Sequence, residues 1–114
     1  MKNIVWALFI SPLFVAAQGS GINFLEHVSW QEVLQKAKAE NKYIFVDCYA
    51  SWCGPCKWMD QNVYIKDAVG TRVNDKFVSV KIQMDVTKND NEAIKNWYTT
   101  TQTFEKQYDI HAYR

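Results

Sequence analysis

The 114-residue chain is poor in net charge, in proline and in side chains that bind metals. Its 13 Lys and Arg residues nearly balance 12 Asp and Glu residues, which gives a formal charge of +1 at pH 7. A balance so close to neutral gives no indication of nucleic acid or an anionic membrane as a partner. The sequence has no internal repeat, low-complexity segment or linker, so we expect one small domain.

The three cysteines, Cys48, Cys53 and Cys56, are too few for a disulfide framework, and their odd number leaves at least one thiol free or exchanging. Two residues separate Cys53 from Cys56, a spacing that can close into a small disulfide and reopen. This spacing favours a reversible redox site over a static cross-link. Half of a zinc site is the alternative. Neither Cys48 nor the distant His27 and His111 supply further ligands at matching spacing, so we predict no metal.

The first 17 residues have the pattern of a secretory signal peptide. A basic start is followed by a mostly apolar segment from Ile4 to Ala17, which ends in small residues before the expected cut. The segment is too short and wrongly flanked to span a membrane. The alternative is an apolar N-terminal helix of the mature domain. We expect residues 18–114 to be exported to the periplasm or secreted, without stable membrane insertion, in compartments where disulfides persist.

Helical and strand patterns alternate along the rest of the chain. Ser29 and Glu32 form a capping box ahead of a helix predicted over 30–40. The apolar run 43–50, interrupted only at Asp47, suits a strand buried on both faces. This alternation of strands and helices predicts an α/β fold with parallel strand pairs and helices on its faces. The other expected elements are strands at 22–25 and 78–82, helices from about 53 to 62 and over 67–74, and a long final helix over 94–108.

The segment Phe45–Lys57, FVDCYASWCGPCK, resembles the active-site stretch of thioredoxins. It is most similar to exported thioredoxin-like thiol:disulfide interchange proteins of bacteria. Similarity in pattern and element order extends over residues 22–113, but only 45–57 match specifically. The resemblance implies a thiol:disulfide oxidoreductase acting on protein disulfides with an unidentified redox partner. The resemblance also implies that such an enzyme needs no organic cofactor, because the dithiol carries the electrons.

The resemblance assigns a role to each residue of the CGPC motif. It makes Cys53 the nucleophile and Cys56 the resolving cysteine of a redox disulfide. A helix N-terminus at Cys53 would stabilise its thiolate, which agrees with that role. Cys56 lies one helical turn further and is expected to be less exposed than Cys53. Gly54 and Pro55 shape the turn, Pro55 fits the first turn of a helix, and Lys57 completes the motif.

Three further residues match the family's pattern around the cysteines. Asp47 stands six positions before the nucleophile, where the family has a buried carboxylate that moves a proton to or from the second cysteine. A structural aspartate bonded to a turn is the alternative for Asp47. Lys81 stands where the family often has a lysine near that carboxylate, and it is either ion-paired there or solvated. Trp52 would shield the site and give substrate a flat contact.

The sequence departs from the family at its end. Family members continue with a cis-proline facing the two cysteines, followed by two strands and a helix. Arg114 occupies the proline's place, and the chain's prolines are Pro12 and Pro55. We therefore expect an incomplete thioredoxin-like fold that contains the βαβαβα portion and lacks the C-terminal ββα portion. The strand at 43–50 would then form a sheet edge. The second functional hypothesis is accordingly a catalytically inactive binding module or remnant.

Overall fold

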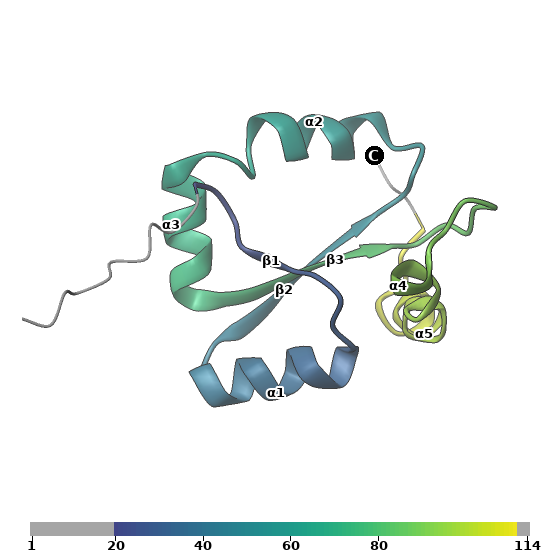
Figure 1. Ribbon diagram of the computed structural model, residues 1–114, viewed down its shortest axis with the longest axis horizontal. Helices are drawn as coiled ribbons and strands as arrows, with labels where there is room; N and C mark the ends of the chain where they lie inside the picture. Colours follow the sequence, from purple (N-terminus) through teal and green to yellow (C-terminus); the bar gives the residue numbers. More distant parts are fainter. Residues whose placement is uncertain (1–19, 112–114) are drawn as a thin grey trace, which may run out of the picture.

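A computed structural model describes residues 20–111, so the expected signal peptide and Arg114 lie outside the described residues. Three parallel strands form a sheet in the order β1-β3-β2, with helices on both faces (Figure 1). The predicted α/β fold with parallel pairs is confirmed. The elements are β1 (Phe24–Leu25), α1 (Trp30–Glu40), β2 (Tyr43–Tyr49), α2 (Gly54–Asn62), α3 (Asp67–Lys76), β3 (Phe77–Gln83), α4 (Glu92–Lys95) and α5 (Tyr98–Tyr108).

The helix α1 begins with the capping box that the sequence predicted. The Ser29 hydroxyl oxygen accepts a hydrogen bond from the Glu32 backbone N–H at 3.3 Å, and Glu32 Oε2 accepts one from the Ser29 backbone N–H at 2.6 Å. The two bonds satisfy N–H groups that the first helical turn leaves without partners. This prediction is therefore confirmed at the level of single atoms.

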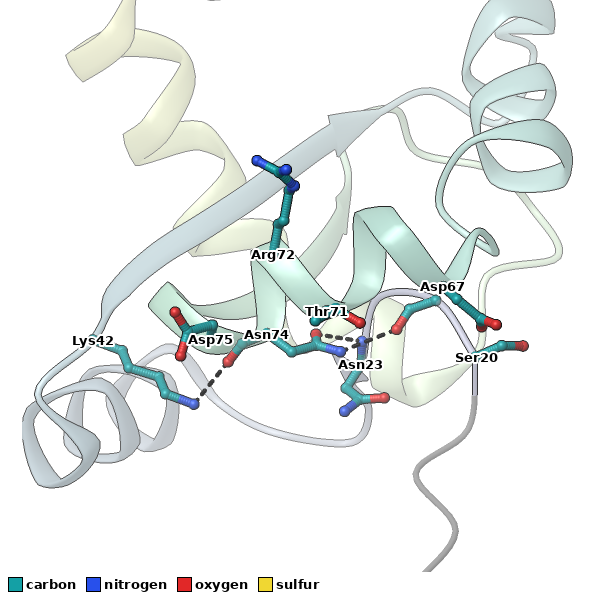
Figure 2. A pocket seen from close by; sticks show the side chains of 9 residues that line it. Ser20, Asn23, Lys42, Asp67, Thr71, Arg72, Asn74 and Asp75 are labelled. Atoms are coloured by element: carbon teal, nitrogen blue, oxygen red, sulfur yellow. Dashed lines mark hydrogen bonds between the residues drawn. The ribbon is translucent and has the colours of Figure 1, made fainter.

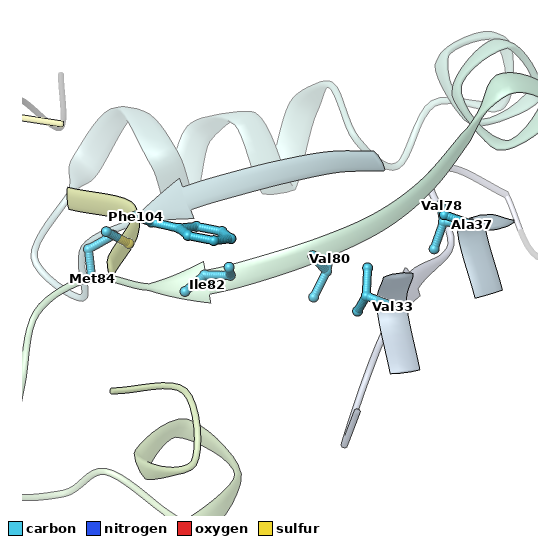
Figure 3. Packing of buried hydrophobic residues seen from close by; sticks show 7 residues of the cluster. All are labelled: Val33, Ala37, Val78, Val80, Ile82, Met84 and Phe104. Carbon is cyan, nitrogen blue, oxygen red and sulfur yellow. The ribbon is translucent and has the colours of Figure 1, made fainter. Parts of the chain in front are cut away.

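The main hydrophobic core lies between one face of the sheet and the helices α1 and α5. Alternate residues of β3 project onto this face, and Trp30 of α1 packs edge-to-face on Phe104 of α5 with ring centroids 5.0 Å apart. Burying each large apolar side chain contributes about 1.5–3 kcal/mol to folding. The buried cluster consists of Val33, Ala37, Val78, Val80, Ile82, Met84 and Phe104 (Figure 3).

The prediction that the strand at 43–50 is buried on both faces is wrong. Most residues of β2 are half-buried, and Tyr43 is exposed. The reason is its place in the sheet: within the described residues, β2 pairs with β3 alone and forms an edge. The central strand is β3, and its residues Val78 to Val80 are buried. The sheet edge that the resemblance led us to expect for this strand therefore agrees with the described residues, whereas the apolar sequence by itself does not distinguish a central strand from an edge strand.

The single long helix expected over 94–108 is also wrong, because the structure has two helices, α4 and α5. The backbone N–H of Trp97 donates to the carbonyl of Ile94 at 3.0 Å. This bond reaches back three residues, as in a 3₁₀ turn, instead of the four residues of an α-helix. α5 then starts without a side-chain cap. Trp97 and Phe104 both pack on the core cluster, so the apolar spacing continues across the break and hides it from sequence analysis.

The chain entering β1 lies tightly against α3. The Asn74 side chain accepts a hydrogen bond from the backbone N–H of Asn23 at 2.9 Å and donates one to the carbonyl of Gly21 at 3.0 Å (Figure 2). Gly21 has a φ of 88°, a conformation that favours glycine. A Cβ built on Gly70 of α3 would lie 2.1 Å from the Gly21 carbonyl oxygen. The two glycines therefore allow the backbone of α3 to lie directly against the backbone of the segment before β1.

Candidate active site

Cys53 and Cys56 form a disulfide at the N-terminus of α2 (Figure 1 shows α2 following β2). Cys53 is the N-cap residue of α2, and its sulfur accepts a hydrogen bond from the Cys56 backbone N–H at 3.1 Å. The backbone N–H of Cys53 donates to the carbonyl of Ala50 at 3.1 Å and turns the chain from β2 into the helix. Pro55 lies in the first turn of α2, as predicted. The sulfur pair thus sits where a helix terminus favours negative charge.

The expected order of exposure of the two cysteines is wrong in this structure. Cys53 is 1% exposed, whereas Cys56 is half-buried. Cys53 lies inside the turn closed by its bond to Ala50, whereas α2 buries none of its residues fully, so its first turn remains open to solvent. Trp52 is 65% exposed beside the disulfide.

Asp47 and Lys81 meet on the face of the sheet that α2 covers. They are paired in register on β2 and β3, and Lys81 Nζ lies 2.8 Å from Asp47 Oδ2. The sequence left open whether Lys81 is ion-paired or solvated. The structure shows the ion pair with Asp47. The two side chains are 25% and 16% exposed, so the interaction is only partly screened by water.

Asp60 is a second carboxylate on the same lysine, and the sequence analysis missed it. Its Oδ1 accepts a hydrogen bond from Lys81 Nζ, and its side chain is 42% exposed. Asp60 follows Cys56 by four residues on α2, so the two share one helix face. That spacing was the signal in the sequence that could have identified it. Lys81 therefore joins Asp47 of the sheet to the helix that carries Cys56.

Aromatic rings surround this shared cation. Lys81 Nζ lies 5.2 Å from the ring centroid of Phe24, 5.1 Å from that of Tyr49 and 5.3 Å from that of Tyr64. Burial lowers the pKa of Lys81, but hydrogen bonds and charge from Asp47 and Asp60 outweigh burial and raise it. The ring faces favour the ammonium as well. Lys81 is therefore held in its charged form under α2.

A further polar pair, also missed from the sequence, fixes the loop before the disulfide. The backbone N–H of Ser51 donates to Asp85 Oδ1 at 2.7 Å, and the Ser51 hydroxyl donates to Asp85 Oδ2. Asp85 comes directly after the Gln83–Met84 end of the β3 region, and Met84 N–H donates to the Tyr49 carbonyl at 2.8 Å. The carboxyl ends of the parallel strands β2 and β3 therefore meet at the disulfide.

The loop that carries Asp85 is organised around Asp90. Asp90 accepts hydrogen bonds from the Thr87 backbone N–H at 2.8 Å, from Gln83 Nε2 at 2.9 Å and from the Tyr98 hydroxyl at 2.6 Å. The Thr87 backbone bond is the largest cause that holds the pKa of Asp90 well below its usual 3.8. The hydrogen bond to Asp90 in turn raises the pKa of Tyr98 to about 12. The ionised Asp90 carboxylate is thus the form that the fold favours.

Stability should therefore depend on pH through Asp90. Its folded-state pKa is depressed, so the ionised carboxylate stabilises the fold above about pH 3.8, and this contribution is lost as the pH falls below that value. We expect Asp90→Asn to be less stable than the parent protein at pH 7, with a difference that shrinks below pH 3.8. Urea unfolding of both proteins at several pH values measures it. A difference that stays constant with pH would contradict this assignment.

The remaining predicted residues lie around the disulfide or behind it. Lys57 and Gly54 are exposed on α2, and the space around a Cβ at Gly54 is open, so packing does not require glycine there. Cys48 is a free, half-buried cysteine that lies with Val46 and Ile44 beside the core cluster. Burial raises the pKa of the Cys48 thiol, which keeps it protonated and weakly nucleophilic.

Residues 20–111 contain neither a cluster of metal ligands nor a helix suited to span a membrane. In that part of the chain, no three His, Cys, Asp or Glu side chains gather so that they could hold a metal ion. None of the helices described there is both long and apolar enough to cross a membrane.

The fold and the site define an α/β domain that carries a cysteine pair at a helix N-terminus. The chain belongs to the thioredoxin-like family, whose sequence model matches residues 26–110. The prediction of a thioredoxin-like α/β fold, drawn from the CGPC segment, is thereby confirmed, and its small sheet agrees with an incomplete thioredoxin fold. No solved structure matches the chain.

Similar proteins include thiol:disulfide interchange proteins and thioredoxins. The chain is 30% identical over 90 residues to the thiol:disulfide interchange protein DsbD of Vibrio cholerae, covering 76% of this chain and 14% of that protein. It is 40% identical over 57 residues to thioredoxin Y, chloroplastic, of Oryza sativa, covering 50% of this chain and 30% of that one. It is 45% identical over 56 residues to a protein disulfide-isomerase of Gallus gallus, covering 49% and 10%. The chain thus spans less than a third of each of these relatives.

Proposed function

We propose that the protein is a thiol:disulfide oxidoreductase that reduces or exchanges disulfides in exported proteins. The observation that carries this proposal is the Cys53–Cys56 disulfide at the N-terminus of α2, in a chain of the thioredoxin-like family. The similarity to two DsbD thiol:disulfide interchange proteins, from Vibrio cholerae and Campylobacter jejuni, supports the same reaction class. The dithiol carries two electrons itself, so no organic cofactor enters the proposed reaction.

The reaction proceeds by two exchanges between sulfur atoms. The Cys53 thiolate attacks a substrate disulfide, so a Cys53–substrate bond forms and the departing sulfur takes up a proton. Cys56 then loses its proton and attacks Cys53 Sγ, which closes the Cys53–Cys56 disulfide and releases the second substrate thiol. Two electrons pass to the substrate. A redox partner that carries its own dithiol must supply them again.

Asp47 is the proposed proton acceptor for Cys56. Its support is geometric: Lys81 links the Asp47 carboxylate to Asp60, one turn beyond Cys56 on the same helix, so Asp47 faces the inner side of α2. A carboxylate placed within reach of the thiol, directly or through one water, can accept its proton as the second exchange begins. Lys81 holds Asp47 on the side of the sheet that faces α2, and Asp60 holds Lys81 there.

The other residues of the motif serve the site indirectly. Pro55 sets the backbone of the first turn of α2, and Gly54 leaves that turn open to an approaching substrate. Trp52 provides an exposed aromatic surface beside the sulfur atoms. Lys57 adds a positive charge on the outer side of α2. These roles are positioning and contact, and the electron transfer remains with the two sulfurs.

Export of the domain is part of the proposal. The basic, apolar and small-residue order of residues 1–17 supports removal of a signal peptide, with residues 18–114 as the thioredoxin-like domain in the periplasm or outside the cell. Its substrates would be disulfide-bearing exported proteins. Intact mass of the protein recovered from its source cells tests this, since cleavage after Ala17 predicts a mass without the first 17 residues.

The first test is reduction of a disulfide in a model protein, driven by a small dithiol. We expect the parent protein to accelerate the reaction and Cys53→Ser to remove the acceleration, because serine cannot form the mixed disulfide. Circular dichroism of both proteins verifies that the variant is folded. Equal rates for the parent protein and Cys53→Ser would reject the enzyme and leave the second hypothesis, a binding module or remnant without catalysis.

A further inference from the structure

We infer that Asp85 is a positioning residue that sets the redox equilibrium of the Cys53–Cys56 pair through Ser51. The inference rests on the proposed function for its meaning. Both carboxylate oxygens of Asp85 hold Ser51, one through the backbone N–H at 2.7 Å and the other through the hydroxyl. Ser51 is separated from the nucleophile by Trp52 alone. These two hydrogen bonds, which we call the Asp85–Ser51 clamp, therefore act on the turn that carries Cys53.

The clamp extends the ladder between β2 and β3 beyond the last paired strand residues. Met84 N–H donates to the Tyr49 carbonyl at 2.8 Å. Asp85, the next residue, then accepts a hydrogen bond from the backbone N–H of Ser51, two residues after Tyr49. The Cys53 N–H closes the same turn on the Ala50 carbonyl at 3.1 Å. The turn from Ala50 to Cys53 is thus fixed from the neighbouring strand as well as from within.

Asp85 is itself held in place, so it can act as a rigid support. Gln83 Nε2 donates to the Asp85 carbonyl at 3.0 Å and also to Asp90 Oδ1 at 2.9 Å. Asp90 in turn accepts a hydrogen bond from Tyr98 at the start of α5. A connected polar network of this kind keeps its members in one arrangement. The loop after β3 therefore links α5 to the turn before the disulfide.

The clamp matters most when the disulfide is open. The covalent bond restrains Cys53 and Cys56 in the oxidised protein, but noncovalent contacts alone keep the sulfurs close in the reduced protein. A held turn raises the effective concentration of one thiol near the other and so favours closure of the disulfide. Loss of the clamp should shift the equilibrium toward the dithiol. Two hydrogen bonds of ordinary net strength correspond to roughly a tenfold change.

The test is the equilibrium of the full chain with reduced and oxidised glutathione, measured for a set of variants. We expect Asp85→Ala to favour the dithiol by roughly tenfold and Ser51→Ala, which loses the hydroxyl bond alone, by a smaller factor. Asp85→Asn should stay near the parent value, because an amide can accept from the Ser51 N–H and meet its hydroxyl. Asp75→Ala is the matched control, since it removes one carboxylate at an exposed site on α3.

The variants separate positioning from charge. An Asp85→Asn shift equal to that of Asp85→Ala would overturn the inference, because the lost charge would then be the cause. Parent-like equilibria in both Asp85→Ala and Ser51→Ala would overturn it as well. If Asp85→Ala does not fold, Ser51→Ala and Asp85→Asn still decide between positioning and charge. Protein disulfide reduction by the parent protein is measured separately, so an inactive parent with a shifted Asp85→Ala equilibrium would reject the proposed function and leave the clamp.

Discussion

Replacing Cys56 by serine is expected to stop the reaction at the mixed disulfide. Cys53 can still attack a substrate, but a serine hydroxyl at position 56 cannot displace the substrate sulfur. Turnover should fall by about a thousandfold or more, as it does when one member of a catalytic unit is removed. Intact mass spectrometry should find one substrate molecule bound per chain, and a small thiol should release it. Cys53→Ser, by contrast, should bind no substrate.

Cys48→Ser is the matched control for this experiment. Cys48 is also a cysteine of the β2–α2 region, but burial raises the pKa of its thiol, and it projects to the face with Val46 and Ile44. We expect this variant to turn over like the parent protein. A mixed disulfide that persists in Cys56→Ser but disappears in the double variant with Cys48→Ser would assign the trapped sulfur to Cys48 and contradict the proposed roles.

Substituting Gly70 by alanine should cause a large loss of stability. The new Cβ would meet the Gly21 carbonyl oxygen at 2.1 Å and the Gly21 Cα at 2.6 Å, and both are backbone atoms. Asn74 and the bond from Ile22 N–H to the Tyr64 carbonyl hold that segment in place. The gain in helix propensity, about 1 kcal/mol, is smaller than the overpacking cost. We expect a net loss of about 2–4 kcal/mol in urea unfolding.

Gly54→Ala provides the comparison, because it also adds a methyl group within a helix. Apart from its chain neighbours and the adjacent backbone of α2, no heavy atom lies within 4 Å of the Cβ that alanine would place at position 54. Its free energy of unfolding should change by less than about 1 kcal/mol. If Gly70→Ala proved as stable as Gly54→Ala, the segment before β1 would have to move freely away from α3, contrary to the contacts of Asn74.

Local signals in the sequence predicted much of the fold. The capping box at Ser29 and Glu32 fixed the start of α1, and Pro55 placed the first turn of α2, because these residues act on neighbours within one turn. The break at Trp97 was missed because the apolar spacing runs through it, since Trp97 packs beside the core and against Trp30, with ring centroids 6.4 Å apart. That contact joins residues far apart in the chain, and periodicity does not report it.

In the candidate site, too, local patterns were predictable from the sequence and contacts between distant segments were not. The spacing of Cys53 and Cys56 is a local pattern, and the sequence identified the pair directly. Asp60 and Asp85 were missed because each gains its place from a strand or helix that lies distant in the sequence, through Lys81 or through Ser51. The relative exposure of the two cysteines also depends on the turn geometry at Ala50, which residue type does not specify.

The sharing of Lys81 by two carboxylates has a consequence for how α2 is held. α2 buries none of its residues fully, so apolar burial contributes little to its attachment, and the contact of Asp60 with Lys81 carries a correspondingly larger part. Asp60 is open enough to water for dissolved ions to screen that contact. The helix that carries the disulfide should therefore loosen with rising ionic strength before the apolar core between the sheet and α1 responds.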